Sequence, residues 1–363
     1  MPVSSPAASD RRAGPLVPEI YRQRHWLTTA LVLLGMALYF HYGHLLPVPG
    51  RFGEVDKRSG QTLYNEWLWL SAIVIGFFLV FGIAGRFAFS TASFVGLGAY
   101  VSHYATSSGN NWTVGLIAAM VTGFVVASVF AVLVRKAHHF YFAVATLGLA
   151  ELLLLVFRRT ERFTGRPGGE ITGVRDATLF GFEFDSRYRH FWLLLVFLAI
   201  ALAIAVLVMR SPLRRDAIAA RDKPEVAETL GIDPAWIGIV MFTVGSVIAA
   251  AAGSIFVHTR QLGTPETFGL ELGIGIFIVL ILGGMHSPFG PIIGAWVYVY
   301  APLYLERWEE WTQAIWGLVL VGVMIAFPDG LIGVFERIRD AVRGRVGPRR
   351  DHAGAKMAER ITR

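Results

Sequence analysis

Residues 191–209 read FWLLLVFLAIALAIAVLVM, an uncharged stretch that decides how the rest of the chain is interpreted. The hydrocarbon core of a bilayer is about 30 Å thick and takes about 20 helical residues at about 1.5 Å per residue. This stretch therefore predicts a membrane-spanning helix. Seven further stretches are similarly apolar and similarly long: 26–46, 66–85, 112–134, 139–157, 235–257, 267–285 and 313–333.

The composition of the whole chain agrees with several such helices. Of its 363 residues, 54% are hydrophobic and 16% are charged, and the mean hydropathy is +0.53. Soluble proteins average roughly 45–50% apolar and about 25% charged residues. A soluble two-domain enzyme of this length would need far more polar surface. The predicted fold class is all-α, a polytopic transmembrane helical bundle.

Two weaker stretches decide the number of segments. Residues 88–105 are rich in small and hydroxylated side chains, and residues 289–305 contain Pro291 and Pro302. Glycine, proline and serine are tolerated at membrane depth where neighbouring helices satisfy the backbone. Counting both stretches gives about ten segments, and either of the two is open to a broken or re-entrant course.

The distribution of Lys and Arg predicts the orientation of the bundle. With both termini in the cytoplasm, the predicted inner segments hold 21 of the 33 basic residues and the outer segments hold 12. Cytoplasmic loops carry the excess of Lys and Arg, so an N-in, C-in topology is expected. The chain then divides into a polar cytoplasmic tail (1–25), a transmembrane domain (26–333) and a basic cytoplasmic tail (334–363). The net charge of +7 is a topology signal and gives no reason to expect nucleic-acid binding.

Two loops are long enough to form interaction surfaces. The predicted inner loop, 210–234, has the pattern of two short helices broken near 222–224, with Pro224 suited to a first helical turn and Gly231 to the position past a helix end. The predicted outer loop, 158–190, mixes seven arginines with five acids. Each loop is either a docking surface or an ordinary solvated connector.

Motifs of catalysis are absent from the sequence. Neither H-E-x-x-H nor G-x-S-x-G occurs, and the chain has no cysteine. A phosphate-binding loop requires a lysine after a glycine, and none of the four lysines follows one. The chain is therefore not expected to be an enzyme or to hold a metal, and any ATP hydrolysis belongs to another chain.

Polar groups inside apolar segments are candidates for a transport path. Glu151 lies near the middle of 139–157, where it is open to three roles: a proton relay, a ligand for a substrate ammonium, or a neutral acid hydrogen-bonded to a neighbouring helix, which we favour. Ser90, Thr91 and Ser93 lie in the weakly apolar stretch 88–105. Such stretches either permit close helix packing or line a translocation route.

Six stretches, in order along residues 65–335, carry a resemblance to a known family. The chain resembles the branched-chain amino acid permeases of ABC importers, the LivM type. The stretches are FSTASFVGLGAY (89–100), YFAVATLGLAEL (141–152), TGRPGGEITGV (164–174), the loop 213–233, LGGMHSPFGPIIGA (282–295) and FPDGLIG (327–333).

The resemblance gives the inner loop a role. Permeases of this class carry an E-A-A-x-x-x-G element that docks into the ATPase, and Glu225, Ala227 and Gly231 match its first, third and seventh positions, while Val226 replaces the middle alanine. The alanines are explained by a small-residue face that lets the helix seat closely. The predicted ATPase-coupling residues are Arg214, Arg215, Arg221, Asp222, Glu225, Ala227 and Gly231.

The resemblance also implies partners and a location. It implies a bacterial cytoplasmic (inner) membrane importer with a second related permease, two ATP-binding subunits that use ATP and Mg, and an extracytoplasmic solute-binding protein. No cofactor is expected in this chain itself. The candidate contacts to the binding protein are Arg158, Arg159, Arg162 and Arg166.

The substrate stays open at this stage. The family often has Gly-Gly after the threonine of its outer turn, where this chain has Gly165 and Arg166. Branched-chain or related amino acids are the expected substrates, and urea or short amides are the alternative within the family. A rival of a different class is a stand-alone, proton-coupled secondary transporter that uses Glu151.

Overall fold

The structure, a computed structural model, describes residues 35, 57–137, 139–159, 161, 167–179, 182–305, 317–318, 321–322, 325 and 330–333. The chain divides after Glu54, and the elements below belong to Val55–Arg363. The expected tails 1–25 and 334–363 lie outside the described residues. So does most of the expected segments 26–46 and 313–333.

Six helices in the described part of the chain are long and apolar enough to cross a bilayer. They are α2 (Lys57–Phe77) with its π-helical extension η3 (Phe78–Ile83), α4 (Trp112–Leu133), α5 (His139–Arg158), α7 (Arg187–Arg210), α10 (Pro234–Arg260), and the 3-10 turn η5 (Pro265–Phe268) with α11 (Leu270–Gly283). Each coincides with an apolar stretch of the sequence. The prediction of an all-α helical membrane protein is confirmed.

The two weaker stretches are helical as well. Residues 88–105 contain α3 (Thr91–Ser107), and residues 289–305 contain α12 (Gly290–Leu305). With 17 and 16 residues, both are shorter than the six spanning helices. The described residues therefore support six spans, and the count of ten remains a prediction.

The core lies where α3, α4 and α10 pack against one another. Gly98 of α3 lies against the carbonyl of Ala250, and Gly253 of α10 lies against the carbonyl of Val95, so closely that a Cβ at either glycine would overlap that backbone. Small residues at a crossing let two backbones approach and gain dispersion contacts, which is how membrane helices associate. The small residues of 88–105 thus serve close packing at this crossing.

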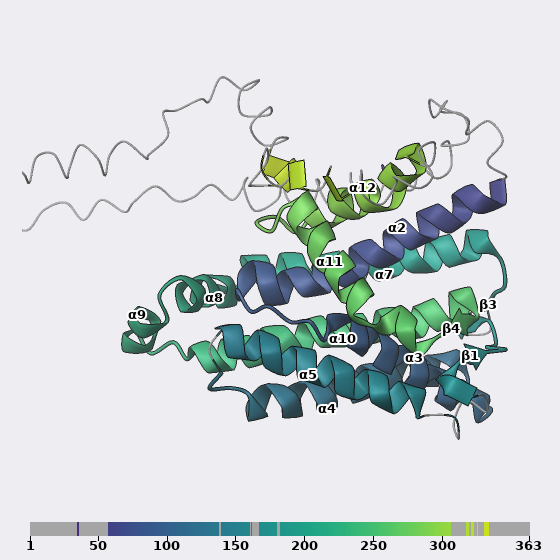
Figure 1. Cartoon of the computed structure of the whole chain (residues 1–363), viewed down its shortest axis with the longest axis horizontal. Coiled ribbons are helices and arrows are strands. Elements are labelled where there is room, and N and C mark those ends of the chain that lie inside the picture. The colour runs from purple at the N-terminus through teal and green to yellow at the C-terminus, as the bar shows by residue number, and fades with distance from the viewer. Residues whose placement is uncertain are drawn as a thin grey trace, which may run out of the picture. The chain divides into compact units, whose positions relative to one another are not determined.

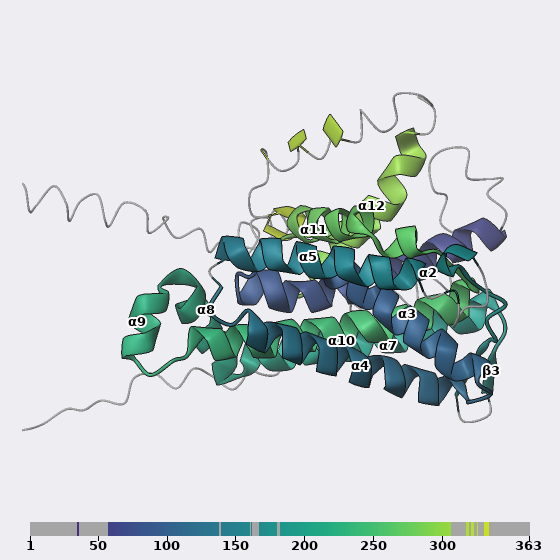
Figure 2. The same ribbon diagram turned by 60° about the horizontal axis from the view of Figure 1, so that its bottom comes forward.

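The two ends of the helix bundle differ in structure (Figures 1 and 2). One end carries two short helices, α8 (Pro212–Asp222) and α9 (Pro224–Thr229). The other end carries two small antiparallel pairs that the sequence did not predict. They are β1 (Ile171–Thr172) with β4 (Leu262–Gly263), and β2 (Ala177–Leu179) with β3 (Phe182–Phe184).

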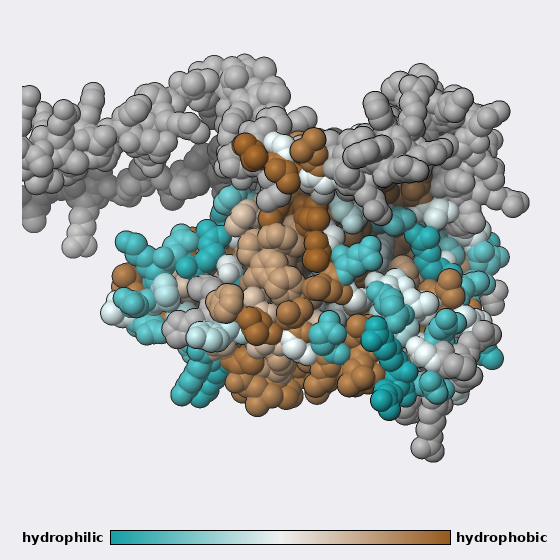
Figure 3. Space-filling view, in the orientation of Figure 1, coloured by the Kyte–Doolittle hydropathy of each residue, from teal (hydrophilic) through white to brown (hydrophobic). Residues whose placement is uncertain are grey.

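The surface between these ends is apolar (Figure 3). On the visible face, hydrophobic side chains form a band across the middle and hydrophilic ones gather on either side of it. Exposed side chains of α4 and α5 belong to the apolar surface, among them Ile117, Phe124, Leu152 and Leu155. Exposed apolar surface of this extent is stable in lipid, so the long axis of the bundle crosses the membrane.

Candidate functional site

The inner loop forms two helices because prolines and extended residues punctuate it. Ser211 is extended (φ −77°, ψ 159°) and precedes Pro212, the first residue of α8. Lys223 (φ −148°, ψ 80°) separates α8 from α9, which begins at Pro224. Proline suits the first helical position because its missing N–H would have no helical partner there. The break predicted near 222–224 is confirmed at Lys223.

Gly231 ends α9 in a defined way. Its φ of +79° lies in the left-handed region that favours glycine. The N–H of Ile232 donates to the carbonyl of Ala227 at 3.0 Å, and the N–H of Gly231 donates to the carbonyl of Glu228 at 3.0 Å. This pair of bonds is a Schellman motif, which turns the chain back toward α10. Gly231 therefore sets the direction in which the chain leaves α9.

The alanines of this loop face the bundle. Ala217 and Ala220 of α8 and Ala227 of α9 are buried, and the two helices pack against each other and against α10. The sequence interpretation placed the small-residue face against a partner, whereas in the structure these three side chains face the protein's own bundle. The coupling role of the loop stays a prediction. These alanines are small so that the loop can lie close to its own bundle.

A different face of α9 is exposed. Val226 and Leu230 are 51% and 72% exposed, and their spacing of four residues puts them on one side of the helix. Glu225 beside them is exposed as well, and so is Trp236 at the start of α10. We call Glu225, Val226 and Leu230 the α9 face. Apolar side chains exposed together on a polar loop are typical of a docking surface.

Arg221 joins this loop to a spanning helix. Its Nη1 donates to the carbonyl of Gly82 in η3 at 2.8 Å, and its Nε pairs with Asp222 at 3.0 Å. The last carbonyls of a helix have no partner within the helix, and a cation there is also favoured by the helix dipole. Arg221 is therefore a structural tie between α8 and the end of α2. Arg214 is partly buried, and Arg215 and Asp222 are exposed.

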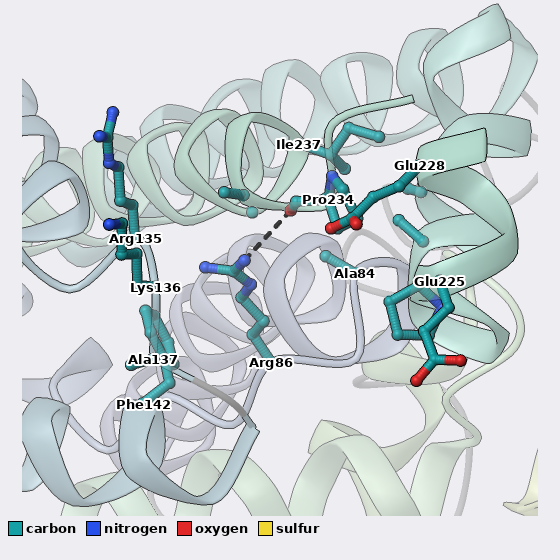
Figure 4. Close-up of a pocket in the computed structure, with 15 residues that line it drawn as sticks. Ala84, Arg86, Arg135, Lys136, Ala137, Phe142, Glu225, Glu228, Pro234 and Ile237 are labelled. Atoms are coloured by element: carbon teal, nitrogen blue, oxygen red, sulfur yellow. Dashed lines mark hydrogen bonds between the residues drawn. The ribbon is translucent and has the colours of Figure 1, made fainter. Parts of the chain in front are cut away.

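A cavity of about 520 Å³ lies beside this tie (Figure 4). It is bounded by the end of η3, the turn between α4 and α5, both loop helices and the first turn of α10. Its charged lining residues are Arg86, Arg135, Lys136, Glu225 and Glu228.

Arg86 is the most enclosed charge of the cavity. Its Nη2 donates to the carbonyl of Pro234 at 3.1 Å, and its guanidinium carbon lies 5.2 Å from the ring centre of Phe142. The guanidinium also lies against Gly238, where any side chain would overlap it. Burial lowers the pKa of Arg86, and the charge of Asp233 raises it. From the sequence, Arg86 was interpreted only as a basic residue on the inner side of the membrane, because the residues that surround it are distant along the chain.

The predicted path residues are buried between α3 and α5. Ser90 is fully buried, and its Oγ has no hydrogen-bond partner among the described residues. Thr91 donates to the carbonyl of Ala88 at 3.1 Å, and Ser93 donates weakly to the carbonyl of Ala150 at 3.5 Å. These hydroxyls contribute to helix packing, and Ser90 is the one whose hydroxyl has no partner there.

Glu151 lies away from these hydroxyls. Its side chain is on the exposed side of α5, whereas the preceding Ala150 is buried. Within the described residues Glu151 has no hydrogen bond or ion pair. The structure therefore does not bring Glu151 together with Ser90, Thr91 and Ser93, and the hydrogen bond to a neighbouring helix that we favoured is not present within this part of the chain.

The strand-bearing end is held together by ion pairs. Arg158 pairs with Glu266 at 3.1 Å, and Arg260 pairs with Glu66 at 2.9 Å. Arg159 is exposed. Arg162 and Arg166, the other two candidate contacts to a binding protein, lie outside the described residues, as does the membrane-edge acid Asp329.

A buried polar network at the same end was missed by the sequence interpretation. Trp112 Nε1 donates to Ser254 Oγ at 3.2 Å, Ser254 and Ser102 are joined at 2.8 Å, and Ser102 is joined to His258 Nε2 at 3.1 Å. His258 Nδ1 lies 2.8 Å from the carbonyl of Arg175. The four side chains come from α3, α4 and α10, so their spacing in the sequence gave no signal.

These features define a class of protein: a multi-pass membrane protein whose loop helices expose an apolar face at one end. The sequence profile of the family described as branched-chain amino acid transport system / permease component matches residues 66–328. The chain belongs to this family, whose members are permease subunits of ABC transporters rather than enzymes.

Individual relatives are named as permease proteins of transport or import systems. The chain is 27% identical to the high-affinity branched-chain amino acid transport permease LivM of Salmonella typhimurium, over 77% of this chain and 70% of that protein. It is 24% identical to LivH of the same organism, over 76% and 94%. It is 27% identical to the autoinducer 2 import permease LsrC of Escherichia coli, over 77% and 83%. Among solved structures there is no significant match.

Proposed function

We propose that this chain is the permease subunit of a bacterial ABC importer, which forms the path for branched-chain or related amino acids and is coupled to a separate ATPase. The observation that carries the proposal is the α9 face, where Val226 and Leu230 are exposed on a loop whose buried alanines pack onto its own bundle. An apolar face in a polar loop is stable when a partner covers it.

The proposed coupling runs through the loop as a rigid unit. ATP binding closes the pair of ATPase subunits, and this motion enters the permease at the α9 face. The hydrogen bond from Arg221 to Gly82 transmits this motion to α2. A second hydrogen bond, from Arg86 to Pro234, links the segment after η3 to the start of α10. Helix α2 packs against α10, and α10 packs against α3. Helix α3 holds Thr91 and Ser93 and has Ser90 as its N-cap, and these three residues are the proposed neighbours of the path.

The proposed assembly has this chain, a second related permease, two ATP-binding subunits and an extracytoplasmic binding protein in the bacterial inner membrane. About ten segments with both termini in the cytoplasm complete the topology. The strand-bearing end then faces outward, and its arginines Arg158, Arg159, Arg162 and Arg166 contact the binding protein. In support, the basic Arg86, Arg135 and Lys136 lie together at the opposite end.

Amino acids are the proposed substrates because the relatives LivM and LivH are named for branched-chain amino acid transport and resemble the chain over three quarters of its length. The relative LsrC, named for autoinducer 2, has a similar identity. Transport assays therefore compare leucine, isoleucine and valine with urea and acetamide, and the accumulated solute identifies the substrate class.

The docking role is tested with Leu230→Asp, which places a charge on the α9 face at a side chain that is 72% exposed. We expect loss of co-purification with the ATPase subunits and loss of ATP-driven uptake, with normal membrane insertion. The matched control is Leu262→Asp, an exposed leucine at the other end of the bundle, which should still co-purify. Uptake by the isolated chain driven by a proton gradient, and abolished by Glu151→Gln, would instead establish the secondary transporter.

A further inference from the structure

The cavity beside the α8–α9 loop lies at a membrane boundary. Four spanning helices begin or end around it, at Ile83, Leu133, Phe140 and Pro234. A helix that crosses the hydrocarbon core must place its ends near the lipid headgroups, because polar connecting backbone is excluded from the core. The cavity is therefore at headgroup depth, whichever direction the protein faces.

Arg86 directs an unused donor into this cavity. Its Nη2 is bonded to Pro234, but its buried Nη1 has no hydrogen-bond partner among the described residues. In Figure 4 this second nitrogen points toward the side of the cavity that carries Arg135. A buried charged donor without a partner is costly, so an acceptor is expected beside it.

The described acids near the cavity do not fill this role. The carboxylate of Asp233 accepts from the N–H groups of Ala235 and Trp236 and is thus engaged in capping α10. Glu225 and Glu228 line the cavity from α9, and both are exposed to solvent. The carboxylate of Glu225 is turned away from Arg86 (Figure 4). The three basic lining residues thus outnumber the acidic ones and leave the cavity suited to an anion.

Exposed apolar and aromatic side chains lie on either side of the basic pair Arg135 and Lys136 along the chain. Leu133 is 77% exposed, Phe140 is 74% exposed and Tyr141 is 69% exposed. Aromatic side chains and basic residues gather at membrane interfaces, where rings contact acyl chains and cations contact phosphates. A free anion or an acidic peptide uses only the charges, whereas a phospholipid uses both halves of this surface.

We propose that this cavity binds the phosphodiester of an anionic phospholipid. Arg86 Nη1 donates to a phosphate oxygen, Arg135 and Lys136 surround the headgroup, and the acyl chains lie against Leu133 and Phe140. The bound lipid touches the turn between α4 and α5, the loop helices and the start of α10. It therefore holds the α8–α9 loop against the membrane, and anionic lipid strengthens coupling.

The test measures lipid retention by the purified full-length chain. Protein is equilibrated in micelles with equal amounts of phosphatidylglycerol and phosphatidylcholine, and bound lipid is counted by native mass spectrometry. We expect phosphatidylglycerol to be retained preferentially. Arg135→Gln/Lys136→Gln, two changes at exposed side chains, should weaken that retention by about tenfold. Arg159→Gln/Arg175→Gln removes the same charge at the other end of the bundle and should leave it unchanged.

Four results would overturn the proposal. Equal retention of both lipids excludes recognition of the anionic headgroup, and equal losses in the two double variants exclude this cavity. Displacement of phosphatidylglycerol by millimolar inorganic phosphate assigns the site to a free anion. Arg86→Gln, a change at the buried donor, should also weaken the retention of phosphatidylglycerol. A thermal unfolding measurement checks that this variant is folded. Added ATPase subunits should leave the lipid in place, and its release would assign the cavity to them.

Discussion

A single tautomer of His258 satisfies the buried network at the strand-bearing end. The carbonyl of Arg175 can only accept, so Nδ1 of His258 carries the proton and Nε2 accepts from Ser102. Ser102 then accepts from Ser254, which in turn accepts from Trp112. All the hydrogen bonds point the same way along the chain of side chains. Every member is satisfied only while every other member is present.

Ser254→Ala tests this network at the scale of one hydroxyl. Removing it leaves the N–H of Trp112 and the hydroxyl oxygen of Ser102 buried with one partner fewer, which costs about 1–3 kcal/mol. We expect a lower unfolding midpoint in detergent. Thr259→Ala is the control, because that hydroxyl donates only within its own helix, to the carbonyl of Phe256. An equal fall in both variants would show that the network adds nothing.

At the scale of elements, the crossing of α3 and α10 depends on direct backbone contact. Gly98 lies against the carbonyl of Ala250, and no rearrangement of side chains makes room for a larger residue there. Overpacking of this kind typically costs about 1–3 kcal/mol, and a clash with backbone lies at the upper end. A larger side chain at Gly98 therefore fits only if the two helices move apart.

Gly98→Leu should therefore reduce the yield of folded protein sharply. Gly148→Leu is the matched control, a helical glycine of α5 with no atom within 4 Å of its Cβ position. The measurement is the monodisperse fraction in size-exclusion chromatography after detergent extraction. Normal behaviour of Gly98→Leu would mean that α3 and α10 are not in contact as described.

Elements differ in how well the sequence predicts them. The six spanning helices were predictable because an apolar run of about 20 residues has few other stable states. The break at Lys223 was predictable because two prolines mark the helix starts. The strands β1 to β4 have two or three residues each, too few to show an alternating pattern. The sequence did not predict that Ala217 and Ala227 face the bundle, because a helix face made of alanines does not show which surface it packs against.

At the scale of the whole molecule, orientation can be measured directly, because the chain contains no cysteine. Glu228→Cys and Ser108→Cys introduce single thiols at exposed positions on opposite ends of the bundle. With both termini in the cytoplasm, an impermeant maleimide added outside should label only Ser108→Cys. Ala127→Cys, which is buried in α4, is the unlabelled control. Labelling of Glu228→Cys from outside would invert the topology.

The candidate site is formed by residues from several separate parts of the chain. The docking loop was predicted from its own residues, since Glu225, Ala227 and Gly231 lie within seven positions of one another. The setting of Arg86 was not, because Phe142, Pro234 and Gly238 approach it from two other helices. A lone arginine between two apolar runs gives only a topology signal. Its burial becomes visible when the helices are packed.

The π-helical end of α2 has a mechanical consequence. In η3 the final turn is wider than an α-turn, and the carbonyl of Gly82 within it is held by Arg221, a side chain of another helix. A wide turn of this kind is more compliant than regular helix and is often found at functional positions. In the proposed coupling, a movement of the loop therefore reaches α2 through the contact of Arg221 with Gly82, at the π-helical end of that helix.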